Sequence, residues 1–300
     1  MTAIPRWREG FPGGRLCKNP RTMPPRVPAL LVGLLLASPV YAQAPDVVHL
    51  FNGKDLSTFT TWLVDDHRED PDRVFTVVDA IDGAPAIRIS GQKYGGIATR
   101  EEFESYHLVV EFRWGAVTWA PRKALARDSG ILVHCQGPDG NTKPDFNGPW
   151  MRSIESQIIE GGVGDFILVA GSDASGARLA PEMTATVSPD RLGQFRFDPQ
   201  GAPRLFTNGQ RINWSGRDVD RGSAPIGFRG VADVEGHGAE WTRLEVIVEP
   251  ERITNIVNGH VVNVGTRPSL TRGRIMIQSE GAEIYFRRVD LYPLPGARRR

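Results

Sequence analysis

The strongest pattern in the sequence is an alternation of side chains with period two. From Tyr106 to Trp114 every second residue is a large apolar one, and His107, Glu111 and Arg113 lie between them. Such alternation places one set of side chains on each face of a β-strand. No comparably long stretch has helical periodicity, so the sequence predicts an all-β protein.

Shorter strands follow from the same pattern, and turn residues separate them. Asn-Gly and Asp-Gly pairs, such as Asn208-Gly209 and Asn258-Gly259, tolerate positive φ at both positions and favour hairpins. Many strands with many turns and few helices predict a two-sheet sandwich, with long loops at 115–128, 136–152 and 171–240. The further strands are expected at Ala86–Ser90, Gly130–Cys135, Ile154–Ile159, Phe166–Ala170, Trp241–Val248, Ile253–Val257, Val261–Val264, Arg274–Gln278 and Ile284–Leu291.

The N-terminal segment has the pattern of a secretory signal. Basic residues precede the apolar run Ala29–Val40, and small residues follow at Ala42 and Ala44. We therefore expect residues 1–42 to be a cleaved signal peptide, with Met23 as an alternative start of translation. The alternative is an N-terminal membrane anchor. The signal predicts a periplasmic or secreted protein with no stable membrane insertion after cleavage.

The remaining chain is expected to form one domain, residues 43–294, followed by a basic disordered tail, residues 295–300. Removing residues 1–42 takes away six basic residues and one acidic residue, so the net charge falls from +1 to −4. The net charge of +1 for the whole chain already argues against a nucleic-acid partner. Cys135 would then be the one remaining cysteine, which excludes a disulfide-stapled scaffold.

Polar side chains gather on particular strand faces. Glu155 and Gln157 share one face of their strand, opposite Ile154 and Ile158, and Glu160 follows, where a bulge would turn it to the Glu155 face. In a jelly roll, the concave sheet would collect such groups into a sugar-sized cleft. The alternative is a solvated outer face with cross-strand polar pairs. The residues expected in the cleft are Arg113, His134, Glu155, Gln157 and Gln278.

Two further expectations concern aromatic residues and metals. Trp119 and Trp150 lie in predicted loops, where their flat faces suit stacking on sugar rings. His134 and Glu155 are candidate ligands for a divalent cation, although no HxH or HExxH pattern accompanies them. No motif for an organic cofactor is present in the sequence.

Several motifs in order give the chain a resemblance to a known family. It resembles the 3-keto-disaccharide hydrolase domain family, formerly a domain of unknown function, over roughly Val48 to Pro293. The motifs are Leu50–Leu56, Gly95–Thr99, Tyr106–Arg113, Asp128–His134, Ile154–Gly161, Gly273–Gln278 and Gly281–Val289.

The resemblance implies a concanavalin-like jelly roll and an activity. Family members act as 3-keto-glucoside 1,2-lyases or 3-keto-2-hydroxyglucal hydratases, with net hydrolysis, on sugars oxidised by a separate 3-oxidoreductase. The cluster carried over by position is Arg113, Ser129, His134, Glu155, Gln157 and Gln278. A 3-keto group acidifies the C2 proton, so elimination needs a base, an enediolate stabiliser and an acid.

Roles within this cluster follow from that chemistry. We expect Glu155 or His134 as base, Arg113 or a metal as stabiliser, Glu160 as acid, and Gln157 and Gln278 as hydrogen-bonding partners of sugar hydroxyls. Two other functions stay open. One is a retaining glycoside hydrolase on unoxidised glycans, which Gln157 in place of a titrating residue argues against. The other is a non-catalytic sugar-binding module, because function does not follow from the fold.

Overall fold

The computed structural model describes residues 47–190, 194–214, 224–230 and 232–299. These residues belong to the compact unit Ala44–Arg300. The predicted signal peptide, residues 1–42, lies outside the described residues. Within the described ranges no helix is long and apolar enough to cross a membrane.

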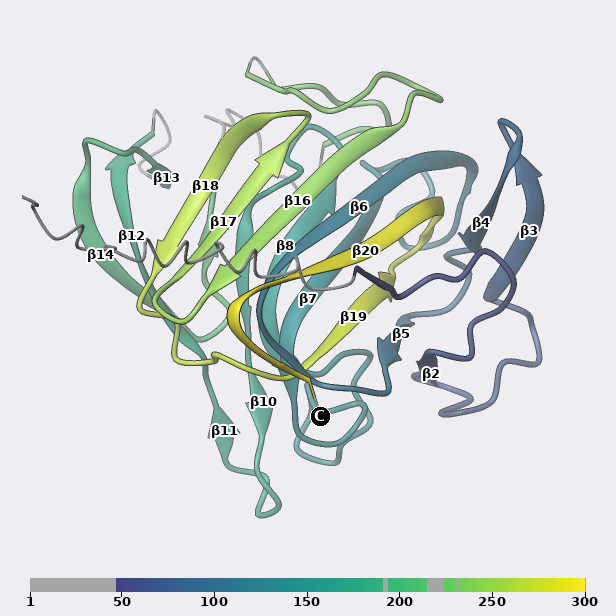
Figure 1. Cartoon of the computed structure of the whole chain (residues 1–300), viewed down its shortest axis with the longest axis horizontal. Helices are drawn as coiled ribbons and strands as arrows, with labels where there is room; N and C mark the ends of the chain where they lie inside the picture. The colour runs from purple at the N-terminus through teal and green to yellow at the C-terminus, as the bar shows by residue number, and fades with distance from the viewer. Residues whose placement is uncertain (1–46, 191–193, 215–223, 231, 300) are drawn as a thin grey trace, which may run out of the picture. The chain divides into compact units, whose positions relative to one another are not determined.

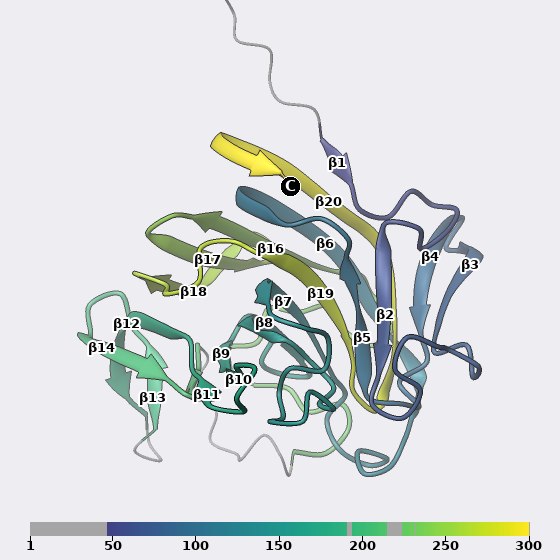
Figure 2. The ribbon, with the colours of Figure 1, turned by 90° about the horizontal axis from the view of Figure 1, so that it is seen from below.

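Two antiparallel sheets form a sandwich, which confirms the predicted all-β fold (Figures 1 and 2). Counted over the described residues, the larger sheet has 11 strands and the smaller has seven. The larger sheet contains β1 (Val48–His49), β3 (Phe75–Ile81), β4 (Ala84–Ile89), β6 (Phe103–Thr118), β12 (Glu182–Pro189), β13 (Phe195–Phe197), β14 (Ala202–Thr207), β16 (Thr242–Glu249), β17 (Arg252–Val257), β18 (His260–Thr266) and β20 (Ala282–Arg299). The smaller sheet runs in the order β15 (Arg211–Ile212), β9 (Phe166–Val169), β8 (Arg152–Ile159), β7 (Asp128–Gln136), β19 (Arg274–Ser279), β5 (Gly95–Thr99) and β2 (Phe59–Leu63).

The core fills the space between the two sheets. The alternate residues of β6 that begin at Tyr106 are buried in it, as the period-two pattern predicts. Ile154 and Ile158 of β8 and Ile275 of β19 meet them from the smaller sheet. Because neighbouring residues of a strand point to opposite faces, the polar partners of these isoleucines face away from the core.

The predicted turns form where Asn-Gly and Asp-Gly pairs occur. Asp82 and Gly83 join β3 to β4 with φ of 52° and 84°, and Asn258 and Gly259 join β17 to β18 with φ of 47° and 84°. Both pairs adopt the left-handed conformation that a two-residue hairpin turn requires.

Two expectations about irregular segments are wrong. The segment 171–240, expected to be a loop, contains a two-stranded ribbon, β10 (Gly171–Ser172) with β11 (Arg178–Leu179), and strands β12 to β15. The tail expected to be disordered continues β20, which pairs Arg298 with Glu104 and Arg299 with Phe103. The long edge of β6 supplies backbone partners for it, so strand pairing outweighs the polar composition of this segment.

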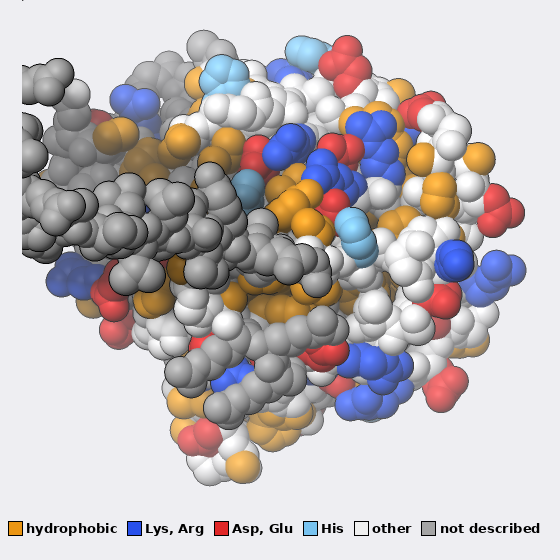
Figure 3. Space-filling model, viewed as in Figure 1, with side chains coloured by type: hydrophobic (Ala, Val, Ile, Leu, Met, Phe, Trp, Pro, Cys, Tyr) orange, Lys and Arg blue, Asp and Glu red, His pale blue; other side chains and the backbone are white. Residues whose placement is uncertain are grey.

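The outer face of the larger sheet carries charged side chains of both signs next to one another (Figure 3). Arg287 pairs with Glu111 at 2.6 Å, Arg288 with Asp290 at 2.7 Å, and His107 lies 2.6 Å from Glu245. This face is the solvated side of an antiparallel sheet.

Candidate functional site

The polar cluster lies on the face of the smaller sheet that points away from the core. Glu155 and Gln157 come from β8, and Gln278 comes from β19, two strands away across β7. All three side chains are buried. Gly130 of β7 lies between them, and a Cβ there would clash with the carboxyl group of Glu155 and the amide of Gln278. Glycine at this position therefore lets the two side chains meet.

An open cavity of about 350 Å³ lies over this face. Glu155 and Gln157 form part of its floor, and Gln278 lies beside Glu155 beneath it. This volume suits a sugar unit, because ligand sites start near 300 Å³. The residues around it are Arg122, Asp128, Thr142, Lys143, Pro149, Trp150, Glu155, Gln157, Ile167, Val169, Ala170, Arg178, Gly209, Arg211 and Glu280.

Glu155 is a buried carboxyl group without a cation in contact. Burial raises its pKa well above the usual range, and the nearby acids Glu280 and Asp128 raise it further. Its Oε1 and the Oε1 of Gln157 are both buried and have no hydrogen-bond partner among the described residues. Since buried polar atoms are almost always paired, these oxygens are ready to bind a polar ligand.

Glu280 differs from Glu155 because an arginine holds it. Arg122 donates from Nη2 to Glu280 Oε1 at 3.0 Å and also pairs with Asp128. Burial raises the pKa of Glu280 to about 8, and Asp128 adds to the rise, while Arg122 opposes both effects. Glu155 and Glu280 therefore share one cavity, and of the two, among the described residues, Glu280 alone has an arginine in direct contact, while Arg211 acts on Glu155 from a longer distance.

An aromatic wall closes one side of the cavity. Trp150 lies in the loop before β8 and donates from Nε1 to the carbonyl oxygen of Gly95 at 3.1 Å. Its ring packs near that of Tyr94, with centroids 6.2 Å apart. The hydrogen bond fixes the indole, so its remaining face is available for stacking on a sugar ring.

The expectation that His134 lies in the cluster is wrong. A register shift interrupts β7 after Val133, and His134 has a φ of 55°. This β-bulge turns the imidazole into the core, where Nδ1 donates to the carbonyl oxygen of Leu270 at 2.6 Å and the ring meets that of Tyr106 edge-on. Burial lowers the pKa of His134 to about 4. His134 and Glu155 therefore point to opposite faces of the sheet.

The placement of Arg113 in the cluster is also wrong. Arg113 lies on β6 of the larger sheet, with its side chain on the outer face of the molecule. It pairs with Asp82 at 2.8 Å and lies over the rings of Trp241 and Tyr285. The alternation along β6 gave the correct face of this strand but not the sheet to which it belongs.

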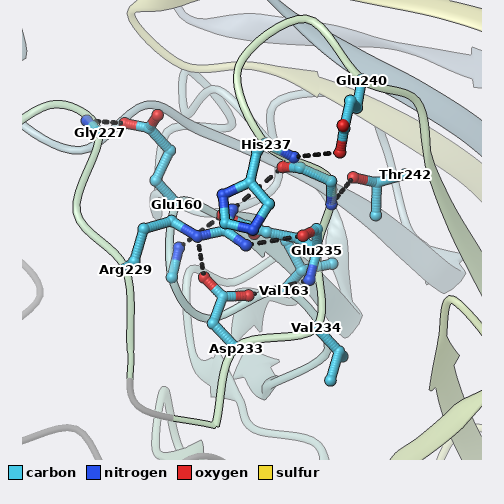
Figure 4. Close-up of polar contacts among 12 residues, drawn as sticks. Glu160, Val163, Gly227, Arg229, Asp233, Val234, Glu235, His237, Glu240 and Thr242 are labelled. Carbon is cyan, nitrogen blue, oxygen red and sulfur yellow. Dashed lines mark hydrogen bonds and ion pairs between the residues drawn. The ribbon is translucent and has the colours of Figure 1, made fainter.

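Glu160 is at the end of β8 but does not reach the cavity. The strand stops at Ile159, and the side chain pairs with Arg127 at 2.6 Å and accepts from the backbone nitrogen of Gly227. Figure 4 shows it beside a second polar cluster, where Arg229 contacts Asp233 and Glu235. The predicted bulge toward Glu155 is therefore wrong, because these partners hold the carboxyl group elsewhere.

Two other expected residues lie outside the cavity lining. Ser129 belongs to the core face of β7 and donates from Oγ to the carbonyl oxygen of Gln278 at 3.0 Å. Trp119 donates from Nε1 to the carbonyl oxygen of Ser90 at 2.9 Å and lies away from the cavity. Both side chains donate hydrogen bonds to backbone carbonyl oxygens and so stabilise the surrounding fold.

The metal expected at His134 and Glu155 does not fit the site, because the two side chains face opposite ways. Among the described residues no group of three or more His, Cys, Asp or Glu side chains is placed to hold a metal ion.

Four charged residues of the cavity lining are not among the predicted site residues: Asp128, Glu280, Arg122 and Arg211. Glu280 shares the strand alternation of Gln278, and Asp128 that of Gly130, so the same pattern could have indicated both. No local signal marks Arg122 or Arg211, because the loop and the edge strand that carry them come to the cavity only in the folded sheet.

The cavity over the smaller sheet, with buried carboxyl and amide groups and Trp150 in its lining, is a site for a small polar ligand in a β-sandwich protein. A family model described as the 3-keto-alpha-glucoside-1,2-lyase-like domain matches residues 46–291. The chain belongs to this family, which confirms the resemblance seen in its motifs. This membership makes it a carbohydrate-active enzyme or carbohydrate-binding domain.

Solved structures with similar folds have low sequence identity. A "putative glycosyl hydrolase" from Parabacteroides distasonis is 15% identical, with 83% of this chain and 94% of that chain covered and a TM-score of 0.46. A second one from the same organism is 17% identical, with 83% and 100% covered and a TM-score of 0.44. The carbohydrate-binding module CBM66 from Bacillus subtilis is 11% identical, with 78% and 94% covered and a TM-score of 0.39. No curated protein matches the sequence.

Proposed function

We propose that the cavity binds a 3-keto-glycoside and catalyses elimination of its C1 substituent, or hydration of the resulting 3-keto-2-hydroxyglucal. The observation that carries the proposal is the pair of buried carboxyl groups in one cavity, Glu280 with an arginine contact and Glu155 without one. Groups whose surroundings separate their proton affinities are suited to act as base and acid.

In this proposal Glu280 is the base. Arg122 stabilises its ionised form, and a pKa of about 8 gives the carboxylate a high proton affinity near neutral pH. It removes the C2 proton, which the neighbouring 3-keto group makes acidic, and the electron pair forms an enediolate. The amide of Gln157 and the guanidinium group of Arg122 line the same cavity and are candidate donors to the enediolate oxygen.

Glu155 is the acid, which reverses the role expected from the sequence. Burial raises the pKa of its carboxyl group well above the usual range, which favours the protonated form that an acid needs, and Gln278 lies beside it. When the enediolate returns to a ketone, C1=C2 forms and the C1–O bond breaks, and Glu155 gives its proton to the leaving oxygen. In hydration the proton transfers run in reverse, with water adding at C1, and the two steps together amount to hydrolysis.

The test is a paired assay on the purified protein. A methyl glucoside and its 3-keto derivative are supplied separately, and formation of the 3-keto-glucal is followed by ultraviolet absorbance. We expect product only from the keto sugar, and a loss of about 100-fold or more in kcat for Glu155→Gln and for Glu280→Gln. If elimination is not seen, the glucal is supplied to measure hydration.

Glu249→Gln is the matched control. Glu249 is on β16 of the larger sheet, where it forms an exposed pair with Arg252, so its replacement should leave turnover unchanged. Turnover of the unoxidised glucoside would contradict the proposal and support a glycoside hydrolase. Sugar binding that persists in both cavity variants, without turnover by the unmodified protein, would support a binding module.

A further inference from the structure

The rim of the cavity carries three cations that form no ion pair with an acid among the described residues, although Arg211 is close enough to Glu155 and Glu280 to lower the pKa of each. Arg122 is paired with Asp128 and Glu280, but three other cations surround the same cavity: Lys143, Arg178 and Arg211. Arg178 donates to the side-chain oxygen of Asn208, which is uncharged. Within the described part of the chain, none of the three has a carboxylate within ion-pair distance.

Arg211 is the most closely placed of the three. In the strand registers Glu155 pairs with Ile167, and Ile167 pairs with Arg211, so the three residues share one face across adjacent strands. Two strand spacings separate Glu155 from Arg211, or about 10 Å between backbones. A separation of about 10 Å equals roughly two sugar units. The arginine side chain shortens the distance between its guanidinium group and Glu155.

Arg211 is half-buried and donates no hydrogen bond among the described residues. A guanidinium group carries five donors and prefers planar, bidentate acceptors such as a carboxylate. The Arg211 side chain lines the cavity, so these donors are accessible to a ligand there. The arrangement therefore suits an acceptor that arrives with the ligand.

The charge balance of the cavity favours an anion. Four cations and three acids line it, and Glu155 is one of those acids. Burial raises the pKa of Glu155 and so disfavours its charged form, and the other two acids share Arg122, so three of the four cations form no ion pair among the described residues. Lys143 and Arg178 are exposed, so they add a longer-range field that attracts anions.

We propose that the ligand of this site is an acidic sugar, whose carboxylate or sulfate ester pairs with Arg211. This inference rests on the proposed function only for the location of the site. The anionic group lies on the reacting sugar or on its C1 substituent, and both placements bring it within the field of the same arginine.

The test is a binding measurement that needs no turnover. Methyl glucoside, methyl glucuronoside and methyl glucoside 6-sulfate are titrated separately into the protein, and calorimetry or tryptophan fluorescence gives each Kd. We expect at least one anionic sugar to bind about 10- to 100-fold more tightly than the neutral one. Arg211→Gln should remove that preference, and Arg211→Lys should keep part of it. Arg252→Gln, an exposed arginine on β17, should leave the preference unchanged.

The two sugars distinguish the source of the anion. Tight binding of the glucuronoside alone indicates a carboxylate, and tight binding of the sulfate ester alone indicates a sulfate. A glycoside of neutral glucose with an acidic aglycone, titrated in parallel, tests placement of the charge on the C1 substituent. Equal affinity for neutral and anionic sugars in all arms, or a preference that survives Arg211→Gln, would overturn the inference.

A kinetic arm separates this inference from the proposed reaction. The 3-keto forms of the same sugars are compared by kcat/KM. A binding preference without turnover keeps the acidic-sugar inference and refutes the proposed chemistry. Turnover without a charge preference keeps the proposed chemistry and refutes the acidic-sugar inference.

Discussion

Replacing Glu235 by glutamine tests whether a buried acid limits the stability of this protein at alkaline pH. Glu235 lies in the polar cluster of Figure 4, where Oε1 accepts from the backbone nitrogen of Gly161 at 2.9 Å and from Arg229 at 3.1 Å. The residue is only 5% exposed. Burial raises the pKa of its carboxyl group from 4.5 to about 8, and Asp233 adds to the rise.

The size of the effect follows from this shift. A carboxyl group with a raised pKa binds its proton more tightly in the folded state, so folding loses stability as pH rises above the unfolded value of 4.5 and reaches the full loss near pH 8. Each pH unit in that range costs about 1.4 kcal/mol. Between pH 5 and pH 8 the cost is about 4 kcal/mol, and glutamine, which does not titrate, avoids it.

The assay is urea unfolding at pH 5, 6.5 and 8, followed by tryptophan fluorescence. The difference in unfolding free energy between Glu235→Gln and the unmodified protein should move by about 1.4 kcal/mol per pH unit in favour of the variant. Glutamine keeps an acceptor for Gly161, and Arg229 keeps its pair with Asp233 at 3.1 Å, so the fold should persist. Glu240→Gln, an exposed change in the same loop, should give a flat difference. A flat difference for Glu235→Gln would refute the reasoning.

Four further outcomes are expected. Arg113→Gln should leave kcat/KM for the keto sugar unchanged within about twofold, because Arg113 lies on the other sheet. Trp150→Ala should weaken sugar binding about 10-fold in a fluorescence or calorimetric titration, whereas Trp150→Phe should keep most of the affinity. If Glu280 is the base, kcat should rise with pH until about pH 8, where the carboxyl group becomes ionised, and Arg122→Met should move that limit upward, as a pH–rate profile would show. The Cys135 thiol, buried and with a pKa raised to about 12, should react with a thiol reagent only after denaturation, and rapid labelling of the folded protein would contradict its burial.

Much of the fold was predictable from alternation alone. The pattern from Tyr106 to Trp114 identifies β6 and its buried face, and Asn258-Gly259 identifies the hairpin between β17 and β18. These are local signals of strand period and turn chemistry. The continuation of β20 to Arg299 was not predictable, because its partner is the distant strand β6.

The candidate site was predictable only where strands run unbroken. Glu155 and Gln157 lie where strand parity places them, on the face opposite Ile154 and Ile158. His134 does not, because the bulge after Val133 reverses parity for the rest of the strand. Sheet membership, which decides whether a residue faces the cavity or the opposite surface, depends on long-range pairing that alternation does not encode.

The ribbon of β10 and β11 has a consequence for how such a protein can diversify. The cavity floor is built on central strands that are also packed against the core, so changes there put folding at risk. Arg178, by contrast, comes from a ribbon of two short strands, β10 and β11, that pair with each other. The turn of this ribbon is exposed. Duplicated copies of the chain can therefore change the sequence of this ribbon, and with it the ligand preference of the cavity, while they keep the same cavity floor.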